Sequence, residues 1–240
     1  MARGLEALRA VASLFYPASC AVCGTAVEES MHLCEKCAAR APRISAPFCA
    51  RCSEPFCGAI ENQFVCANCA HRDLQFEAAV SAYRSRSVVR LVLLQFKYNR
   101  QLHLRHVITG WLLEALTDAR LHERVFDAIV PVPLHPARVR ERGFNQAEVL
   151  ARELARHTGL PVLRALERTR YTSTQTLLDR ADRMRNLRNA FRLRKNVSVR
   201  DCRVLLLDDV LTTGSTLSEC AGVLRRQGAC SIFALTAARA

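Results

Sequence analysis

Residues 203–216 read RVLLLDDVLTTGST, in which an apolar run, two carboxylates and a hydroxyl-rich turn follow one another. The run Val204–Leu207 shows no polar alternation, which is typical of a strand buried on both faces of a parallel sheet. Asp208 and Asp209 come directly after it. Because ligands of open α/β sheets bind at the carboxyl ends of the strands, this pair is a candidate binding site.

The turn Thr212–Thr216 places a glycine between hydroxyl side chains and leads into a predicted helix over Thr216–Gln227. Backbone N–H groups at such a helix start, together with the helix dipole, attract phosphate. Carboxylates beside a phosphate site suit a ligand with sugar hydroxyls, because they accept hydrogen bonds from them. The alternative is purely structural, with an acidic turn that precedes a capped helix.

The remaining segments beyond residue 75 alternate between strand and helix patterns, which predicts an α/β fold with helices on both faces of a parallel sheet. Gly159 and Pro161 end one of the helices in the usual way. The predicted strands are Ala78–Tyr83, Phe126–Val132, Val204–Leu207 and Ser231–Thr236, and the predicted helices are Val88–Tyr98, Leu102–Leu116, Asn145–His157 and Thr216–Gln227.

Four CxxC turns lie between residues 20 and 69, in two sets of four cysteines. Two such turns complete a tetrahedral thiolate site for zinc, with bonds of about 2.3 Å. Four thiolates leave no open position for water, so the zinc is expected to be structural, and metal binding would supply much of the folding free energy of this short segment. The candidate ligands are Cys20, Cys23, Cys34 and Cys37, followed by Cys49, Cys52, Cys66 and Cys69.

Several alternatives remain for these cysteines. Disulfides are disfavoured by the odd number of nine cysteines in this segment, and a redox CxxC by the lack of a βαβ setting. Iron–sulfur ligation by the same thiolates stays open. The CxxC turns could also pair in an interleaved order, so the sequence leaves open whether one or two zinc ions bind. Cys57 is left over and is interpreted as a bystander.

The composition changes near residue 70, which predicts a domain boundary. The chain is 50% hydrophobic and 24% charged, which excludes a disordered, collagen-like or polytopic membrane protein. Residues 1–70 hold six basic and six acidic side chains, so the whole formal charge of +13 lies in 71–240. Within 138–203, 17 basic residues stand against 7 acidic ones, and almost all of the basic ones are arginines.

Residues 1–18 predict a short amphipathic helix, since apolar side chains recur at three- and four-residue intervals and Pro17 ends the pattern. The apolar stretch Ala10–Tyr16 is short, and Glu6 and Arg9 interrupt what precedes it, so a signal peptide is not expected. No run in the sequence approaches the ~20 apolar residues of a membrane helix. We therefore expect a cytoplasmic protein that does not insert into a membrane.

The stretch 203–216 resembles the phosphoribosyl pyrophosphate (PRPP) motif of the type I phosphoribosyltransferases. The chain as a whole resembles the ComF family, the competence and GntX group, in which a zinc ribbon precedes such a domain. Lys97-Tyr98 matches the family pattern less closely. The other matching stretches are Val130–Leu134, Arg138–Gln146, Gln175, Arg183 to Asn186, and Phe191.

The resemblance implies a type I phosphoribosyltransferase fold, a central parallel sheet with flanking helices, preceded by a small zinc-ribbon domain. It divides the chain into a double zinc ribbon at 19–72 and a phosphoribosyltransferase-like domain at 75–240. Within the latter, 75–120 would form the helical hood and 125–240 the PRPP-binding core.

The resemblance also implies roles for individual residues, with Mg²⁺ arriving together with PRPP. Asp208 and Asp209 would contact the ribose hydroxyls. The 5′-phosphate would be bound by Thr212, Thr213, Gly214, Ser215 and Thr216, and the candidates for the pyrophosphate are Arg138, Arg140, Arg142 and Lys97.

A second arginine cluster follows the Gln175 segment. We interpret it either as a nucleic-acid contact, since a basic stripe fits a phosphate backbone, or as a solvated basic face. The ComF family is associated with uptake of transforming DNA and with its use as a nutrient, which implies single-stranded DNA and the competence machinery as partners. The candidate nucleic-acid residues are Arg180, Arg183, Arg185 and Arg188.

Three functions compete. The first is a phosphoribosyltransferase whose acceptor the sequence does not identify and in which no residue stands out as a general base. The second is a non-catalytic single-stranded-DNA-binding competence factor that keeps the fold. The third is a PRPP sensor that binds without turnover. The intact motif favours PRPP binding in each case and leans towards the enzyme, although a fold alone does not prove catalysis.

Overall fold

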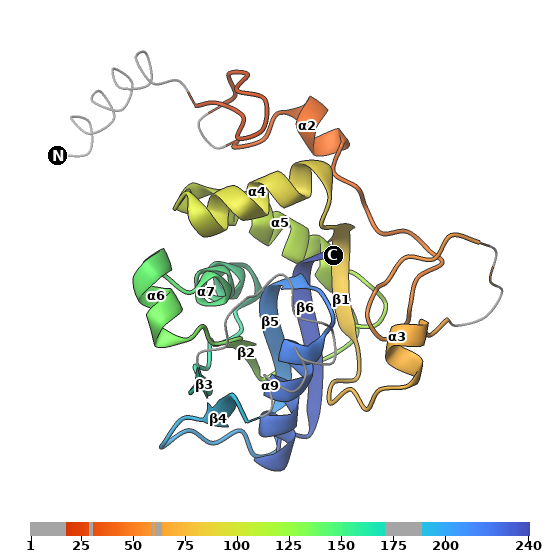
Figure 1. Cartoon of the computed structure of the whole chain (residues 1–240), viewed down its shortest axis with the longest axis vertical. Coiled ribbons are helices and arrows are strands. Elements are labelled where there is room, and N and C mark those ends of the chain that lie inside the picture. The colour runs from red at the N-terminus through yellow and green to blue at the C-terminus, as the bar shows by residue number, and fades with distance from the viewer. Residues whose placement is uncertain (1–17, 29–30, 59, 61–63, 171–188) are drawn as a thin grey trace.

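The computed structural model describes residues 18–28, 31–58, 60, 64–170 and 189–240. Its centre is a parallel four-stranded sheet in the order β1-β6-β5-β2 (Figure 1). Both central strands are long and mostly buried, as a sheet covered on two faces requires. The strands are β1 (Ala79–Arg84), β2 (Ala128–Pro131), β5 (Arg203–Leu211) and β6 (Ser231–Arg239).

Helices cover both faces of this sheet. Helix α5 (Arg105–Leu116) packs on β1 and β6, and α7 (Gln146–Thr158) packs beside it on β5 and β2. Helix α4 (Ser87–Tyr98) lies against α5 (Figure 1). Helix α9 (Ser215–Arg226) packs against β5 and β6 on the opposite face. The expected α/β architecture is therefore confirmed.

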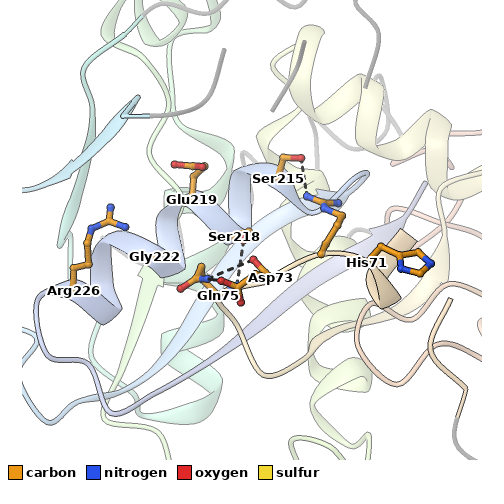
Figure 2. A pocket seen from close by; sticks show the side chains of 9 residues that line it. His71, Asp73, Gln75, Ser215, Ser218, Glu219, Gly222 and Arg226 are labelled. Carbon is orange, nitrogen blue, oxygen red and sulfur yellow. Dashed lines mark hydrogen bonds between the residues drawn. The ribbon is translucent and has the colours of Figure 1, made fainter. Parts of the chain in front are cut away.

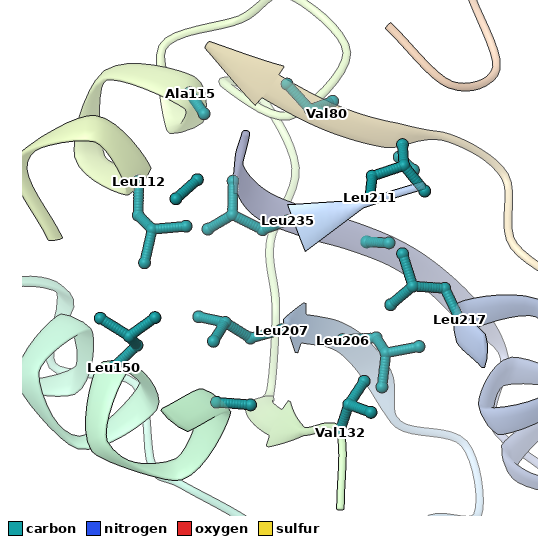
Figure 3. Packing of buried hydrophobic residues seen from close by; sticks show 14 of the residues in the cluster. Val80, Leu112, Ala115, Val132, Leu150, Leu206, Leu207, Leu211, Leu217 and Leu235 are labelled. Atoms are coloured by element: carbon teal, nitrogen blue, oxygen red, sulfur yellow. The ribbon is translucent and has the colours of Figure 1, made fainter. Parts of the chain in front are cut away.

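The core forms two apolar layers, one on each face of β5 (Figure 3). Successive strand side chains point to opposite faces, so Leu207 meets Leu150 of α7 while Leu206 lies on the side of Leu217 of α9. All four side chains are at most 2% exposed. Burial of each stabilises the fold by roughly 2 kcal/mol, which explains why the strand sequence is a continuous apolar run.

The elements begin and end close to where the sequence predicts them, with one exception that bears on the site. Strand β5 does not end at Leu207 but continues through both carboxylates to Leu211. Strand β6 also runs on, and pairs Asp208 with Thr236 in register. The carboxylates therefore lie inside the strand, because β6 supplies a pairing partner for that part of the backbone.

The basic stretch after β2 is a helix rather than an open loop. Helix α6 (Pro136–Arg142) starts with proline in its first turn, and the His135 side chain accepts a hydrogen bond from the Ala137 N–H. Gly143 ends it in a left-handed conformation. The predicted Leu102–Leu116 helix is likewise divided, into a 3₁₀ turn, η1 (Leu102–Leu104), and α5.

A small antiparallel pair of strands was not expected from the sequence. Strand β3 (Leu166–Arg168) pairs with β4 (Phe191–Leu193), and α9 packs against β4. Each strand has only three residues, which is too short for an alternating pattern to be recognised. The pair places Arg168 close to the carboxyl edge of the main sheet, as described below.

The cysteine-rich segment precedes the sheet and lies along its edge. Strand β1 is an edge strand, and its free side is covered by the connection between the two cysteine sets. Ile44 N–H donates to the Ala82 carbonyl at 2.8 Å, and Arg84 N–H donates to that of Pro42 at 2.8 Å. Two short helices, α2 (Glu35–Ala39) and α3 (Ala67–Ala70), each carry the last cysteine of a set.

Three further predictions concern residues 1–18, the membrane and the division of the second domain. The amphipathic helix expected over 1–18 lies almost wholly outside the described residues. Among the helices that the structure describes, none is both long and apolar enough to cross a membrane. The parts assigned to a hood (75–120) and to a core (125–240) share one sheet, since β1 pairs with β6.

Candidate functional site

The carboxylate pair lies at the carboxyl edge of the sheet and is joined to helix α4. Lys97 Nζ, near the end of α4, is 2.7 Å from Asp209 Oδ2, and these side chains are only 18% and 4% exposed. The Asp209 N–H donates to Asp208 Oδ1 at 2.9 Å. Asp209 is thus held by a lysine, and Asp208 is the member of the pair left without a salt bridge of its own among those seen in the described residues.

Burial and the neighbouring charge of Asp209 together raise the pKa of Asp208 to about 8, although Lys97 opposes the shift. Two carboxylates this close cannot both ionise easily in a desolvated site. At neutral pH Asp208 is therefore mostly protonated. A ligand that stabilises its anion would release a proton on binding.

The turn between β5 and α9 has the geometry expected of an anion-binding loop. Gly214 has a φ of +76°, in the left-handed region, and carries no side chain to cap the helix. The hydroxyls of Thr213 and Ser215 lie 2.9 Å apart. Backbone N–H groups of the first helical turn lack intrahelical acceptors and carry the positive end of the helix dipole. The loop can therefore receive a phosphate.

A small basic pocket of about 100 Å³ adjoins the carboxylate pair through Lys97. The Arg142 guanidinium lies over the Tyr98 ring at 5.1 Å, and Arg138 bonds Glu141 at 3.0 Å. The structure thus brings Lys97, Arg138 and Arg142 together around one pocket. Arg140 is exposed and does not line this pocket, because it points from another face of α6. The lining residues are Lys97, Tyr98, Arg100, Arg138, Glu141 and Arg142.

Two arginines near the site were missed from the sequence. Arg168 is the last residue of β3. Burial lowers the pKa of Arg168, the charge of Asp208 opposes this shift, and the charge of Arg138 adds to it. The three groups are therefore close enough to interact electrostatically. Arg72 donates to the Thr213 carbonyl and, at 3.1 Å, to the Ser215 hydroxyl. Its only signal in the sequence is its position three residues after Cys69.

The cysteines form two separate four-thiol clusters. The first is Cys20, Cys23, Cys34 and Cys37, and the second is Cys49, Cys52, Cys66 and Cys69; within each, the sulfur atoms all lie within 4.8 Å of one another. Consecutive CxxC turns therefore pair, and the interleaved order does not occur. Cys57 is exposed and belongs to neither cluster, and all twelve cysteines are free of disulfides.

The chemistry of the second cluster fits a divalent cation. Hydrogen bonds from neighbouring thiols lower the pKa of Cys49, whereas the same contacts raise that of Cys52 to about 12 and that of Cys69 further. Four buried thiols at this spacing cannot ionise together unless a cation neutralises them. The donor set therefore suits structural Zn²⁺, which four thiolates bind with no open position.

The remaining candidates cannot be placed. Arg180, Arg183, Arg185 and Arg188 lie outside the described residues, as do Gln175 and Asn186. The interpretation of this cluster as a nucleic-acid contact stays a prediction.

Comparison with known families finds two domain families in this chain. Residues 11–72 match the family model of the double zinc ribbon domain, and residues 139–240 match that of the phosphoribosyl transferase domain. The chain is 35% identical over 193 residues to competence protein F of Haemophilus influenzae, covering 77% of this chain and 81% of that one. The chain belongs to the ComF family.

Other ComF relatives cover the chain to a similar extent. The DNA utilization protein YhgH of Escherichia coli is 33% identical over 203 residues, covering 83% of this chain and 87% of that protein. Competence protein ComFC of Bacillus subtilis is 26% identical over 215 residues, covering 86% and 84%. A solved adenine phosphoribosyltransferase from Thermoanaerobacter pseudethanolicus is 20% identical, covers 60% of this chain and 72% of that one, and has a TM-score of 0.36.

Proposed function

We propose that this ComF protein binds PRPP together with Mg²⁺ at the carboxyl edge of its sheet. Asp208 and Asp209 accept hydrogen bonds from the ribose hydroxyls. The pyrophosphate is held by the basic pocket through Lys97, Arg138 and Arg142. Arg140, the fourth candidate from the sequence, lies outside this pocket. The 5′-phosphate is bound by the loop of Thr212, Thr213, Gly214, Ser215 and Thr216.

The ion pair between Lys97 and Asp209 carries this proposal. Through this ion pair, the carboxylates lie next to the basic pocket, because Lys97 also lines that pocket. Carboxylates accept hydrogen bonds from hydroxyl groups, and the arginines of the pocket match the geometry of a diphosphate. On the other side of the carboxylates the same strand runs into the phosphate loop. One ligand with a phosphate, a sugar and a diphosphate would match all three features in that order.

The donor set fits a magnesium ion that arrives already bound to the diphosphate. Glu141 is the one carboxylate that lines the basic pocket, and it is paired with Arg138. Mg²⁺ in phosphate-binding sites keeps several waters and uses few protein ligands. When bound, the ion would neutralise charge on the diphosphate oxygens.

We further propose that the protein is a transferase. An acceptor nucleophile would attack C1 of the ribose, the C1–oxygen bond would break, and pyrophosphate would leave with the bonding electrons. Positioning and charge stabilisation are the main contributions available to the chain's own residues. Lys97 and the arginines would stabilise the leaving group, while the carboxylates hold the ribose in place.

The names of the relatives support a role in the handling of DNA. The proteins named for competence and for DNA utilization that are described above match 77% to 86% of this chain. We propose that this protein acts likewise in DNA uptake or in the use of DNA as a nutrient.

The decisive experiment is calorimetric titration of the zinc-loaded protein with PRPP and Mg²⁺. The double variant Asp208→Asn/Asp209→Asn should lose saturable binding. Asp127→Asn is the matched control. Asp127 lies just before β2, at the amino ends of the strands, where it pairs with Arg203 and is remote from the carboxylate pair. Equal affinity in the double variant and the wild type would overturn the assignment.

Single-stranded DNA binding is the second candidate, and the excess of arginine within 138–203 favours it. Affinity for a short oligonucleotide should fall steeply as salt rises, and more gently after Arg183, Arg185 and Arg188 are changed to Ser. Binding that ignores both salt and these changes would return the cluster to a solvated surface. DNA binding without PRPP binding would mean that the fold acts as a scaffold.

A further inference from the structure

The segment that leaves the second cysteine cluster runs directly to the phosphate loop. Arg72 follows Cys69 by three residues, and its N–H donates to the Cys69 carbonyl at 3.3 Å. Its guanidinium donates to Asn68 of α3 and also to Thr213 and Ser215. One side chain therefore touches both the helix that carries a cluster ligand and the loop that opens α9.

The next residues keep this segment in place along α9. The Gln75 N–H donates to the Ser218 hydroxyl at 3.2 Å, and Arg225 Nε donates to the Gln75 carbonyl at 2.9 Å. Between the segment and the helix lies a cavity of about 440 Å³, with Ser215 at one end and Arg226 at the other (Figure 2). The contact of Arg72 with the loop is thus part of an ordered interface.

The direction of the Thr213 carbonyl matters for an anion. In a trans peptide the C=O and N–H groups point in opposite directions. Since the Thr213 carbonyl points at Arg72, the Gly214 N–H in the same peptide unit points away from it. Arg72 also screens the negative end of this carbonyl dipole. Both effects would favour binding of a phosphate on the side of the loop that faces away from Arg72. The Gly214 N–H points to that side, and the negative end of the carbonyl dipole is screened.

We infer that Arg72 is a positioning residue of the phosphate loop, supplied by the zinc ribbon, and that it couples occupancy of the second zinc site to affinity for a phosphate ligand. The inference rests on the proposed function, since PRPP is the phosphate ligand in question. The zinc ribbon would then be a functional part of the binding site. By thermodynamic reciprocity, PRPP would in turn retain zinc in the second site.

The first test measures PRPP·Mg²⁺ affinity of Arg72→Met by calorimetry. Loss of hydrogen bonds from a charged donor should weaken binding roughly ten- to a hundredfold, while both zinc ions are retained. The matched control is Arg226→Met, which removes the same charge at the other end of the cavity and should bind PRPP within about twofold of the wild type.

The second test measures zinc release to a chromophoric chelator. PRPP·Mg²⁺ should slow release from the second cluster in the wild type and in Arg226→Met, but not in Arg72→Met. A merely structural role for Arg72 would change the release rate equally with and without PRPP.

A third variant keeps the test valid if Arg72→Met does not fold. Arg72→Lys retains the charge, but one ammonium cannot bridge Thr213 and Ser215 as a forked guanidinium does, so it should recover only part of the affinity. Full wild-type affinity in Arg72→Lys would overturn the bridging role. Wild-type protein that fails to bind PRPP would refute the proposed function, whereas unchanged binding in Arg72→Met would refute this inference alone.

Discussion

Asp208 and Asp209 show how burial changes the chemistry of identical side chains. Asp209 gains a lysine partner, whereas Asp208 is held beside another carboxylate in a desolvated place. The pKa of Asp208 is raised to about 8, so the free protein carries a proton there at neutral pH. This proton provides a way to detect ligand binding at one residue.

PRPP·Mg²⁺ affinity should therefore depend on pH. Ribose hydroxyls donate to the ionised carboxylate, so Asp208 must lose its proton for the tightest complex. Affinity should rise by up to about tenfold per pH unit below pH 8 and level off above the pKa of about 8. Calorimetry in buffers of different ionisation enthalpy counts the released proton. Asp208→Asn should remove this part of the pH dependence, and a profile unchanged by the substitution would contradict the assignment.

Two glycines should respond to alanine in opposite ways. Gly214 has a φ of +76° and a Cβ there would meet only ordinary contacts, so Gly214→Ala should destabilise the fold by about 1–2 kcal/mol through backbone strain alone. Gly110 lies inside α5 with open space around it, so Gly110→Ala should stabilise by about 0.5–1 kcal/mol. Urea denaturation measures both, and only Gly214→Ala should also weaken PRPP binding. Equal shifts of one sign would contradict this account.

At the scale of elements, the two cysteine clusters differ in exposure. In the first cluster Cys23 is exposed and Cys34 is half-buried, whereas all four ligands of the second are buried. The second cluster also lies against the sheet, where Ala79 N–H bonds the Arg51 carbonyl at 2.9 Å. The second site is therefore the better protected of the two.

Zinc should accordingly leave in two phases when a chelator is added. The fast phase should come from the first cluster, because solvent and chelator reach Cys23 directly. Cys23→Ser should abolish the fast phase and keep the slow one, and Cys52→Ser should do the reverse. Zinc release from the wild type in a single phase would contradict this difference in exposure. So would equal release kinetics in Cys23→Ser and Cys52→Ser.

The sequence predicts the main elements well because their patterns are local. Continuous apolar runs identify β5 and β6, and glycine or proline ends the helices that precede them. The extension of β5 through Asp208 was missed because it depends on pairing with β6, which lies some thirty residues away in the chain. Helix α6 was missed because none of its residues is buried, so it carries no apolar pattern.

At the scale of the whole molecule, the ribbon and the sheet form one packed unit. Arg120, between α5 and β2, donates to the carbonyls of Cys49 and Ala50 and to the Ser53 hydroxyl at 3.3, 3.1 and 3.0 Å. Its guanidinium also lies over Phe48 at 4.6 Å. One side chain thus satisfies several polar groups of the second zinc site.

Arg120→Met should loosen the ribbon from the sheet. It removes the described donor of the half-buried Ala50 carbonyl and one of the two described donors of the Cys49 carbonyl, which should cost about 1–3 kcal/mol. Hydrogen exchange should then accelerate at residues 48–53. Arg152→Met is the control, because Arg152 is 56% exposed and pairs only with Glu148 on the surface among its described partners. That change should cost less than about 1 kcal/mol. Equal exchange rates in the two variants would argue against the role of Arg120.

The candidate site was predictable only where its residues come from one stretch of sequence. The carboxylates and the phosphate loop lie within nine residues of one another, so their order alone suggests a ligand. Lys97 was added by family resemblance. Arg72 comes from the ribbon and Arg168 from β3. Only the tertiary packing of these parts brings Arg72 to the phosphate loop and Arg168 close to Asp208. No local pattern contains that information.

The covered edge of β1 links metal supply to solubility. Without residues 42–51, this strand would present unpaired N–H and C=O groups, and such edges recruit strands from other chains. Those residues are anchored between two clusters that each need a cation to hold four thiolates together. We therefore expect the protein to self-associate through this edge when zinc is withheld, so that metal supply would control its solubility.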